Sequence, residues 1–481
     1  MDISLIIAGR DEAAAGGATF EREDPVTGAV ATRAASARKA DVDRAVEAAA
    51  QAFPAWSRTG PTERRLILNR AADLLETKTA RFIEVARAET GATSPWIGFN
   101  VMLGARILRE AASMTTQIKG EVVPSDKPGT LSLAFRQPVG VLVGMAPWNA
   151  PVILAVRAFA MPLACGNTVV LKASETCPHT HRMIVETLHE AGLPAGVLNL
   201  VTHAAADAPE VVEALVAHPR VKRINFTGST RVGRIIAMEA AKHLKPVLLE
   251  LGGKAPLVVL DDADLEAAVN AAAFGAFLNQ GQICMSTERI IVDERVADRF
   301  VELFAAKAAT LPFGDPREPV VLGAVVSRRA AEAVGELVED AVRAGARVVA
   351  GGEGAGTILP ATVVDGVTPQ MRLFREESFG PVVCVVRARD ADHAVELAND
   401  TEYGLSAAVF GRDVSRAMEV ARRIESGICH INGPTVGDEA QMPFGGTKAS
   451  GYGRFGGTAA IAEFTELRWI TVEDPNQHYP F

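Results

Sequence analysis

Short apolar runs alternate with amphipathic stretches over most of the chain, and this alternation is the feature that most restricts the fold. Each apolar run has the length of a strand, and a stretch with apolar residues at helical spacing follows it. The first series predicts strands at 140–145, 167–171, 196–201, 223–226 and 247–249, and helices at 150–163, at 180–191 and after 230. Strand-then-helix repetition with short connections predicts a doubly wound, mostly parallel α/β sheet.

The alternation restarts near Gly253 and predicts a second α/β unit. Its expected strands are 256–260, 381–386, 406–411 and 427–432, with long helices at 294–310 and 327–344. A chain of 481 residues should form two or three domains, since a domain takes roughly 100–200 residues. We assign residues 1–119 and 139–252 to the first domain and residues 253–449 to the second.

Residues 120–138 stand apart from both units. Gly and Pro residues flank a β-like centre at Thr130–Phe135, which predicts an excursion from the main sheet. The segment 464–472 is predicted to form a final strand. We therefore assign residues 120–138 and 450–481 to an arm and tail that serve contacts between subunits.

Charge and cysteine usage exclude several classes of partner and site. The net charge is −9 without a basic stripe, which argues against nucleic acid and against an anionic membrane surface as partners. The five cysteines contain no CxxC pair, so a reducing compartment without a disulfide framework is expected. No metal site is expected either, because His179 and His181 lack converging ligands and are expected to be solvated.

One uncharged run has the length of a membrane span. Residues 137–156 carry no charge, but Pro138, Pro147 and Pro151 interrupt them, which favours a buried strand and loop. No signal-peptide pattern opens the chain, and a cytoplasmic location is expected.

Cys284 is the first candidate for chemistry. It follows a predicted helix and the segment Asn279-Gln280-Gly281. A cysteine acts as a nucleophile only where its surroundings favour the thiolate. The alternative is a buried structural thiol, so Cys284 needs partners elsewhere in the chain.

Asn149 and Glu250 follow predicted buried strands and are candidate partners. An amide at the carboxyl end of a strand can donate to a developing oxyanion, although a turn Asn that satisfies local backbone is the alternative at Asn149. Burial would raise the pKa of Glu250 and make it a general base near neutrality. A structural Glu with a local backbone partner is the alternative there.

Two further segments suit a nucleotide. Lys172 and Glu175 follow a buried strand and could bind ribose hydroxyls, or form a solvated ion pair. Residues 226–233 combine a strand, a glycine turn and a helix start that suits a phosphate, with an ordinary Ser N-cap as the alternative. Residues 451–456 match GxGxxG formally, but no βαβ unit surrounds them.

Together these motifs resemble the aldehyde dehydrogenase superfamily over nearly the whole chain. The matching segments are PWNAP at Pro147, KASE at Lys172, FTGST at Phe226, LELGGK at Leu249, GQICMS at Gly281, EESFGP at Glu376 and PFGGTKASGYGR at Pro443. Within it, residues 427–435 and 438–442 are most similar to the bacterial aromatic aldehyde dehydrogenases of the salicylaldehyde and vanillin type. The resemblance implies the fold of that family: two doubly wound α/β domains, the first NAD-binding and the second catalytic, plus a small β oligomerisation arm.

The resemblance also implies a mechanism. Cys284 would attack the aldehyde carbon, Asn149 and the Cys284 N–H would hold the oxyanion, and Glu250 would activate the water that hydrolyses the thioester. NAD is the implied cofactor, held by Pro147, Trp148, Lys172, Ser174, Glu175, Phe226, Gly228, Ser229, Val232, Leu251, Glu377 and Phe379. Since the carboxylate of Glu175 suits a free 2′-hydroxyl and repels a 2′-phosphate, NAD is favoured over NADP.

The implied substrate is a small aromatic aldehyde, with salicylaldehyde favoured. Ala150 stands where many relatives have a bulky aromatic residue, which should widen the pocket, and Arg157 offers a cation for a ring hydroxyl. The residues expected to line the pocket are Trp96, Phe99, Ala150, Leu154, Arg157, Ile283, Met285 and Phe444. For each of these a purely structural role in the core is the alternative.

Several points stay open in the sequence. Residues 202–209 replace a glycine-rich turn of many relatives, which leaves the cofactor contacts of that turn open. A broad-range or a CoA-acylating relative and a non-enzymatic structural protein are the other readings. Because Cys284, Glu250 and Asn149 are all present, a hydrolytic enzyme is favoured, as a homodimer or homotetramer.

Overall fold

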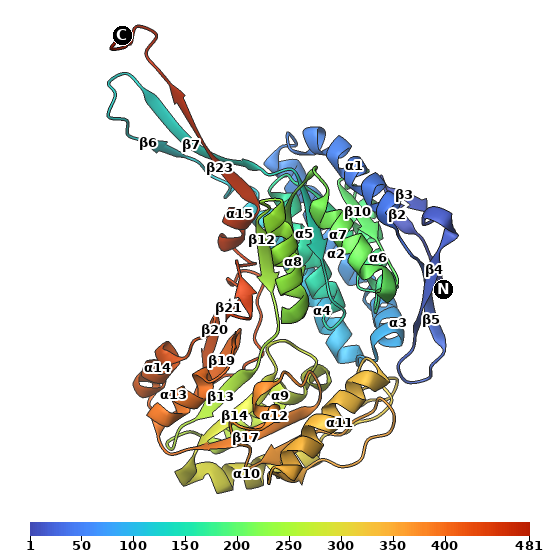
Figure 1. Ribbon diagram of the computed structural model, residues 1–481, viewed down its shortest axis with the longest axis vertical. Coiled ribbons are helices and arrows are strands. Elements are labelled where there is room, and N and C mark those ends of the chain that lie inside the picture. Colours follow the sequence, from blue (N-terminus) through green and yellow to red (C-terminus); the bar gives the residue numbers. More distant parts are fainter.

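The computed structural model describes residues 1–481 and places two α/β lobes below a projecting arm (Figure 1). The first lobe is built on an eight-stranded sheet in the order β22-β12-β11-β8-β9-β10-β2-β3. In that order the bounds are Gly451–Tyr452, Val247–Glu250, Val221–Thr227, Val141–Met145, Thr168–Lys172, Leu198–Val201, Leu5–Ile7 and Arg10–Glu12. The five strands from β12 to β10 are parallel. At the two sides β22 runs antiparallel to β12 and β2 runs antiparallel to β10, and the edge strand β3 is antiparallel to β2. The α/β prediction is therefore confirmed.

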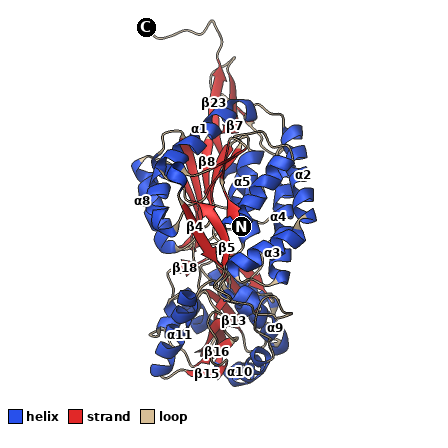
Figure 2. Cartoon of the chain, turned by 90° about the vertical axis from the view of Figure 1, so that its right-hand side faces the viewer, coloured by secondary structure: helices blue, strands red, loops and turns tan.

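The second lobe contains a seven-stranded sheet in the order β15-β16-β17-β14-β13-β19-β20. In that order the bounds are Arg347–Ala350, Thr362–Asp365, Val382–Ala388, Thr287–Asp293, Ala255–Val259, Ser406–Phe410 and Ile428–Ile431. Only β15 is antiparallel to its neighbour. The five central strands are buried along nearly their whole length, because helices cover both faces of each sheet (Figure 2).

Helices cover both sheets. Those of the first lobe are α1 (Lys39–Trp56), α2 (Pro61–Thr77), α3 (Thr79–Thr90), α4 (Ser94–Met114), α5 (Pro151–Ala164), α6 (Pro178–Glu190), α7 (Ala208–Ala217), α8 (Thr230–Lys242) and α15 (Ala459–Glu463). Those of the second are α9 (Leu265–Phe277), α10 (Glu294–Ala309), α11 (Arg328–Arg343), α12 (Arg372–Arg375), α13 (Ala391–Asn399) and α14 (Val414–Arg423). Helix α5 is buried at every position, since it lies between α4 and the first sheet.

Three strands form the arm that leaves the first lobe. In sheet order these are β23 (Thr465–Val472), β7 (Leu131–Pro138) and β6 (Glu121–Val123), all antiparallel. The chain end continues beyond β23 at the tip of the arm (Figure 1). Two residues that we had assigned to the tail, Gly451 and Tyr452, instead form β22 and pair with β12 in the first sheet.

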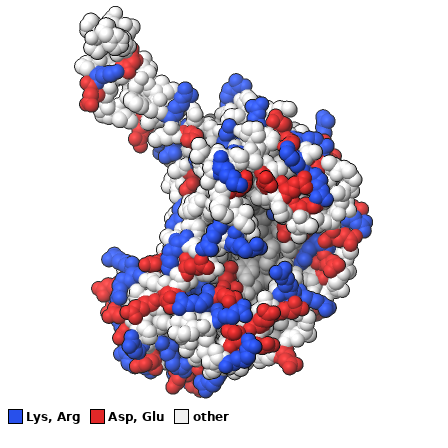
Figure 3. All heavy atoms as spheres, in the orientation of Figure 1, with Lys and Arg blue, Asp and Glu red and all other residues white.

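Smaller sheets complete the fold. The strands β1 (Asp2–Ile3), β5 (Val30–Ala35) and β4 (Thr19–Glu23) form one sheet, and β18 (Tyr403–Gly404) pairs with β21 (Thr447–Lys448). None of the helices is long and apolar enough to cross a membrane. Acidic and basic side chains are interspersed over the face shown in Figure 3.

Candidate active site

Cys284 follows a strained turn at the end of α9. After Phe277 the chain makes a 3-10 turn in which Asn279, Gln280 and Gly281 have φ angles of 50°, 56° and 70°. Left-handed backbone costs about 1–2 kcal/mol for a residue that carries a Cβ. The surrounding structure must therefore impose this turn.

Side-chain amides hold the turn on two sides. Gln280 donates from Nε2 to the Ala324 carbonyl at 3.0 Å and accepts at Oε1 from the Gly323 N–H at 3.0 Å. Asn279 donates from Nδ2 to the Asn149 carbonyl at 3.0 Å. The turn is thus tied to a loop of the second lobe and to a residue of the first, and both ties fix where Cys284 lies.

Cys284 lies in a wall that two cavities share. Asn149, Leu154 and Cys284 line both of them. Burial raises the pKa of the Cys284 thiol to about 12, and the carboxylates of Glu250 and Glu377 act in the same direction. Without ligands the sulfur is therefore a neutral thiol at physiological pH.

Glu250 is the last residue of β12 and is buried. Both of its carboxylate oxygens lack a hydrogen-bond partner, so no local backbone group satisfies them. Burial raises the pKa of Glu250 well above its ordinary value, against the opposing charges of Arg157 and Arg454. A carboxyl group held in this state is suited to exchange protons near neutrality.

Asn149 lies just before α5, and both its backbone carbonyl and its side-chain amide are hydrogen-bonded. Its carbonyl accepts from the Trp96 indole N–H at 2.9 Å, and its Nδ2 donates to the Gln282 carbonyl at 3.0 Å. The amide nitrogen carries a second N–H, and the backbone N–H of Cys284 donates to no backbone carbonyl. These two donors are available to an oxyanion beside the thiol.

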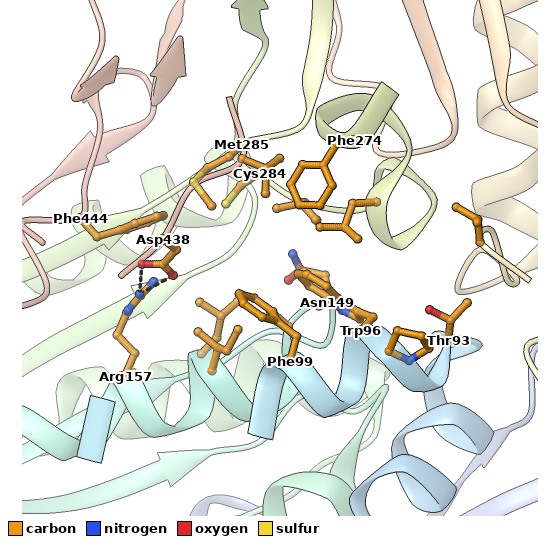
Figure 4. Close-up of a pocket in the computed structure, with 18 of the residues that line it drawn as sticks. Thr93, Trp96, Phe99, Asn149, Arg157, Phe274, Cys284, Met285, Asp438 and Phe444 are labelled. Carbon is orange, nitrogen blue, oxygen red and sulfur yellow. Dashed lines mark hydrogen bonds and ion pairs between the residues drawn. The ribbon is translucent and has the colours of Figure 1, made fainter. Parts of the chain in front are cut away.

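The larger of the two cavities, of about 360 Å³, is the apolar cavity, since 14 of its 19 lining residues are hydrophobic. Cys284 and Met285 reach it from one side, and Trp96 and Phe99 of α4 reach it from the opposite side (Figure 4). Trp96 and Phe99 stack with ring centroids 5.7 Å apart. All eight residues expected to line a substrate pocket line this cavity: Trp96, Phe99, Ala150, Leu154, Arg157, Ile283, Met285 and Phe444.

A buried ion pair closes one end of the apolar cavity. Arg157 donates from Nη2 to both oxygens of Asp438, at 2.9 and 2.7 Å, and its guanidinium lies 4.4 Å from the centroid of the Phe444 ring (Figure 4). The cation expected at Arg157 is therefore already balanced by a carboxylate. Asp438 was not predicted as a pocket residue, because 281 residues separate it from Arg157.

Other lining residues of the apolar cavity had also not been predicted. They are Thr93, Pro95, Ile153, Phe274, Leu278, Val320, Val321 and Val436. Most are ordinary apolar residues of helices and loops, and no local pattern marks them. Thr93 occupies the N-cap position of α4 and Pro95 lies in its first turn, and this helix was not predicted from the sequence.

The second cavity, of about 230 Å³, is the polar cavity on the other side of Cys284. It contains seven residues that were expected to bind a cofactor: Pro147, Trp148, Gly228, Ser229, Leu251, Glu377 and Phe379. Trp148 and Phe379 meet edge to face, with centroids 5.7 Å apart. Thr227 and Gly252, which were not predicted, also line it.

The other predicted cofactor residues lie outside the polar cavity. Lys172 is the last residue of β9, Glu175 lies three residues beyond it, and the two form an ion pair at 3.8 Å. Phe226 packs beneath Gly228, where an added Cβ would overlap the Phe226 ring. The Val232 N–H donates to the Ser229 hydroxyl at 3.4 Å at the N-terminus of α8. Ser174 is buried, and its backbone N–H donates to His181.

His179 and His181 lie in the first turn of α6 and are buried, so the prediction that they are solvated is wrong. The His181 Nδ1 accepts from the Ser174 N–H at 3.2 Å, and burial lowers the pKa of His181 to about 3. The His179 N–H donates to the buried carboxylate of Glu89 at 2.9 Å. No cluster of three or more metal-ligating side chains is present in the chain.

Comparisons with known proteins agree on the whole length of the chain. The model of the aldehyde dehydrogenase family matches residues 12–470. A vanillin dehydrogenase from Pseudomonas fluorescens is 60% identical over 481 residues and covers 100% of both chains. A salicylaldehyde dehydrogenase from Pseudomonas sp. (strain C18) is 53% identical over 465 residues, or 96% of each chain. The crystal structure of a salicylaldehyde dehydrogenase from Pseudomonas putida G7, complexed with salicylaldehyde, superposes with a TM-score of 0.99 at 52% identity and covers 100% of both chains.

Proposed function

The chain belongs to the aldehyde dehydrogenase family, and from this premise we propose that it oxidises a hydroxylated aromatic aldehyde to the carboxylic acid with NAD. The observation that carries the proposal is the place of Cys284 between the apolar and the polar cavity. A nucleophile in such a wall can meet an aldehyde from one side and a hydride acceptor from the other.

In the first step the Cys284 thiol loses its proton to water and the sulfur adds to the aldehyde carbon. The carbonyl oxygen becomes an oxyanion, which the free N–H of the Asn149 amide and the backbone N–H of Cys284 stabilise. Loss of hydride from this thiohemiacetal leaves a thioester on Cys284. NAD, when bound, supplies the hydride acceptor.

The second step is hydrolysis of the thioester. Glu250, with both oxygens unpaired beside the thiol, takes a proton from water as the water attacks the thioester carbon. The carboxylic acid leaves and the thiol is restored. Because an ordinary carboxylate would be too weak a base, the raised pKa of Glu250 favours this role.

The polar cavity fits a dinucleotide on several grounds. It extends from Cys284 to Gly228 and Ser229 at the N-terminus of α8, where unpaired N–H groups favour a phosphate. Gly252 has no Cβ, and an added one would lie 2.7 Å from the Glu377 carboxylate. The glycine therefore lets a polar side chain line a narrow site.

NAD is proposed over NADP because of Glu175. The Lys172 ammonium, 3.8 Å away, contributes to a lowered pKa of Glu175 despite its burial, so the side chain is ionised at neutral pH. An ionised carboxylate accepts from a ribose hydroxyl and repels a phosphate in the same place.

The ring hydroxyl is assigned to the Arg157–Asp438 end of the apolar cavity. Because the Arg157–Asp438 pair is neutral overall, this end of the cavity suits a neutral phenol. It gives no net attraction to a substrate that carries a carboxylate. Asp438 can accept from a hydroxyl, and the flat apolar walls suit the ring. Salicylaldehyde is the first substrate to test and vanillin the second, since both carry a ring hydroxyl.

We also propose that the protein is a homo-oligomer and that it is located in the cytoplasm. The arm exposes Leu467 and Trp469 on one face of its sheet, with 62 and 74% of their surface accessible, and large apolar side chains exposed on such a face favour an interface. The cytoplasm is proposed because the reaction requires Cys284 as a free thiol, which a reducing compartment maintains.

The test is a measurement of NADH formation with salicylaldehyde, vanillin, benzaldehyde and short aliphatic aldehydes, each with NAD and with NADP. We expect the highest kcat/KM with a hydroxylated aromatic aldehyde and NAD. Cys284→Ala is the matched control and should bind NADH without turnover. Reaction with aliphatic aldehydes alone would overturn the aromatic assignment.

A further inference from the structure

A buried ion pair lies behind the polar cavity and takes no part in the chemistry described so far. Lys254 follows the glycines after β12, and Glu288 lies in β14, four residues beyond Cys284. Both side chains are buried, and the Lys254 ammonium is hydrogen-bonded to Glu288 Oε2. Removing one partner of such a pair leaves an uncompensated buried charge, so the two must act together.

Most of the hydrogen-bonding capacity of Glu288 is directed at one segment. The backbone N–H of Ser378 lies 3.0 Å from each oxygen of the Glu288 carboxylate, and the Ser378 hydroxyl donates to Oε2 at 2.9 Å. The N–H of Phe379 donates to Oε1 at 3.2 Å. One carboxylate therefore binds two consecutive backbone N–H groups and a hydroxyl of residues 377–379.

The segment 377–379 needs such an anchor, because its conformation is unfavourable by itself. Phe379 has a φ of 46°, which a residue with a bulky side chain rarely adopts. With this angle, the Phe379 ring meets Trp148 and faces the polar cavity, while the Glu377 carboxylate accepts from the Gly253 N–H at 2.9 Å. Glu377 and Phe379 thus both line the cavity that contains Cys284.

We propose that Glu288, balanced by Lys254, is a positioning residue that fixes segment 377–379 for binding of the cofactor beside Cys284. The inference rests on the proposed function, because it assigns the polar cavity to a nicotinamide cofactor. Glu288 lines neither cavity: it binds Ser378 and Phe379 and acts on the polar cavity through the side chains of Phe379 and the adjacent Glu377.

The ion pair also links the nucleophile to this segment. Glu288 belongs to the strand that begins three residues after Cys284, and Lys254 follows Gly253, whose added Cβ would overlap the Cys284 carbonyl oxygen. The Lys254 carbonyl in turn accepts from Arg289 Nε at 3.1 Å. The buried cluster around Lys254 and Glu288 therefore sets the distance between the Cys284 sulfur and segment 377–379.

Glu288→Gln is the direct test, because Gln keeps the shape and directs an NH₂ group at donors that require an acceptor. We expect the NADH Kd from fluorescence titration and the KM for NAD to rise about tenfold or more, which corresponds to at least about 1.4 kcal/mol. Acylation of Cys284 by p-nitrophenyl acetate, which needs the thiol and no cofactor, should change less than about threefold.

Two further variants separate positioning from stability. The double variant Lys254→Met with Glu288→Leu removes both charges and is expected to fold, since well-packed apolar replacements of buried pairs are often tolerated. It should still bind NADH weakly. Asp365→Asn is the matched control, because Asp365 is a buried carboxylate bound to Arg347 and Arg387, far along the same sheet. It should lower the unfolding temperature with little effect on NADH binding.

The measurements distinguish a positioning role of Glu288 from a general loss of structure. Weak NADH binding in both Glu288 variants with normal thiol acylation supports the positioning role. Unchanged NADH affinity overturns it, and so does a parallel loss of acylation and NADH binding, which would mean a general loss of structure. Absence of aldehyde oxidation in the unmodified protein would contradict the proposed function alone, because NADH binding and acylation are measured without an aldehyde.

Discussion

The chemistry of Cys284 is set by a small group of neighbouring side chains. Reactive cysteines commonly lie beside a cation or a helix N-terminus that lowers their pKa. Here burial and the carboxylates of Glu250 and Glu377 raise the pKa of Cys284, and Arg157, the cation acting on it, is paired with Asp438. Activation must therefore come from deprotonation during the reaction.

The pH dependence of thiol alkylation follows from that environment. With a pKa of about 12, the thiolate fraction of Cys284 rises about tenfold for each pH unit well below that value. We expect the rate of inactivation by iodoacetamide, without cofactor, to rise steadily between pH 7 and 10. A plateau below pH 8 would contradict the neutral-thiol state. Cys429, which is exposed, should be replaced by Ser so that Cys284 alone is measured.

Glu250→Gln should separate the two steps of the reaction. The amide keeps the shape of the side chain but cannot accept a proton from water, so thioester hydrolysis should slow by about a hundredfold or more. Acylation and hydride loss should continue, so a stopped-flow trace should show one equivalent of NADH followed by slow turnover. An unchanged steady-state rate would remove Glu250 from the mechanism.

Individual site residues could be predicted from the sequence where they belong to short motifs. Asn149, Glu250 and Cys284 each follow a strand or helix in a recognisable segment, and the structure brings all three to the polar cavity. The balance of charge at Arg157 could not be predicted, because Asp438 comes from a loop far along the chain and no local pattern joins them.

At the scale of elements, the turn at residues 279–281 determines where Cys284 lies. Its three left-handed residues end α9 abruptly and bring the chain against residue 380, where a Cβ on Gly281 would overlap the Gly380 carbonyl oxygen. Glycine is required there both for its φ of 70° and for the close approach.

Gly281→Ala should therefore destabilise the protein and lower activity together. The left-handed angle costs about 1–2 kcal/mol for Ala, and the forced backbone shift adds about 1–3 kcal/mol. Gly335→Ala is the matched control, since nothing lies within 4 Å of an added Cβ inside α11. It should be neutral or stabilising by about 0.5–1 kcal/mol. Urea unfolding and kcat measure both, and equal behaviour of the two variants would refute the account.

Most elements with a strong hydrophobic period were predicted within a few residues of their bounds. Strand β8, for example, was expected at 140–145 and lies at Val141–Met145. Helix α4 was missed, because its first half is mostly apolar and its polar stripe begins only in the second half, at Arg106, Arg109, Glu110 and Ser113. Strand β22 was missed because its two residues gain a partner only from β12, about 200 residues earlier.

At the scale of the whole molecule, the arm is the feature that favours assembly of more than one copy of the chain. Three strands extend from the first lobe (Figure 1), and two of them, β7 and β23, pair along eight residues. A small sheet becomes independently stable in water only when its hydrophobic face is covered, so we expect another copy of the chain to cover the arm.

Substitution of arm residues tests this assembly. Leu467→Glu with Trp469→Glu should shift the protein to monomers in multi-angle light scattering, because two buried charges would oppose the contact. Leu244→Glu is the control, since Leu244 is 92% exposed and lies outside the arm. An unchanged mass in the arm variant would contradict assembly through the arm.

The place of Cys284 between two cavities has a consequence for inhibitor chemistry. A single sulfur can be reached by an electrophile on a flat aromatic scaffold through the apolar cavity, or by one on a nucleotide-like scaffold through the polar cavity. The two classes of covalent inhibitor would modify the same atom but would be competed away by different molecules, the aldehyde in one case and the dinucleotide in the other.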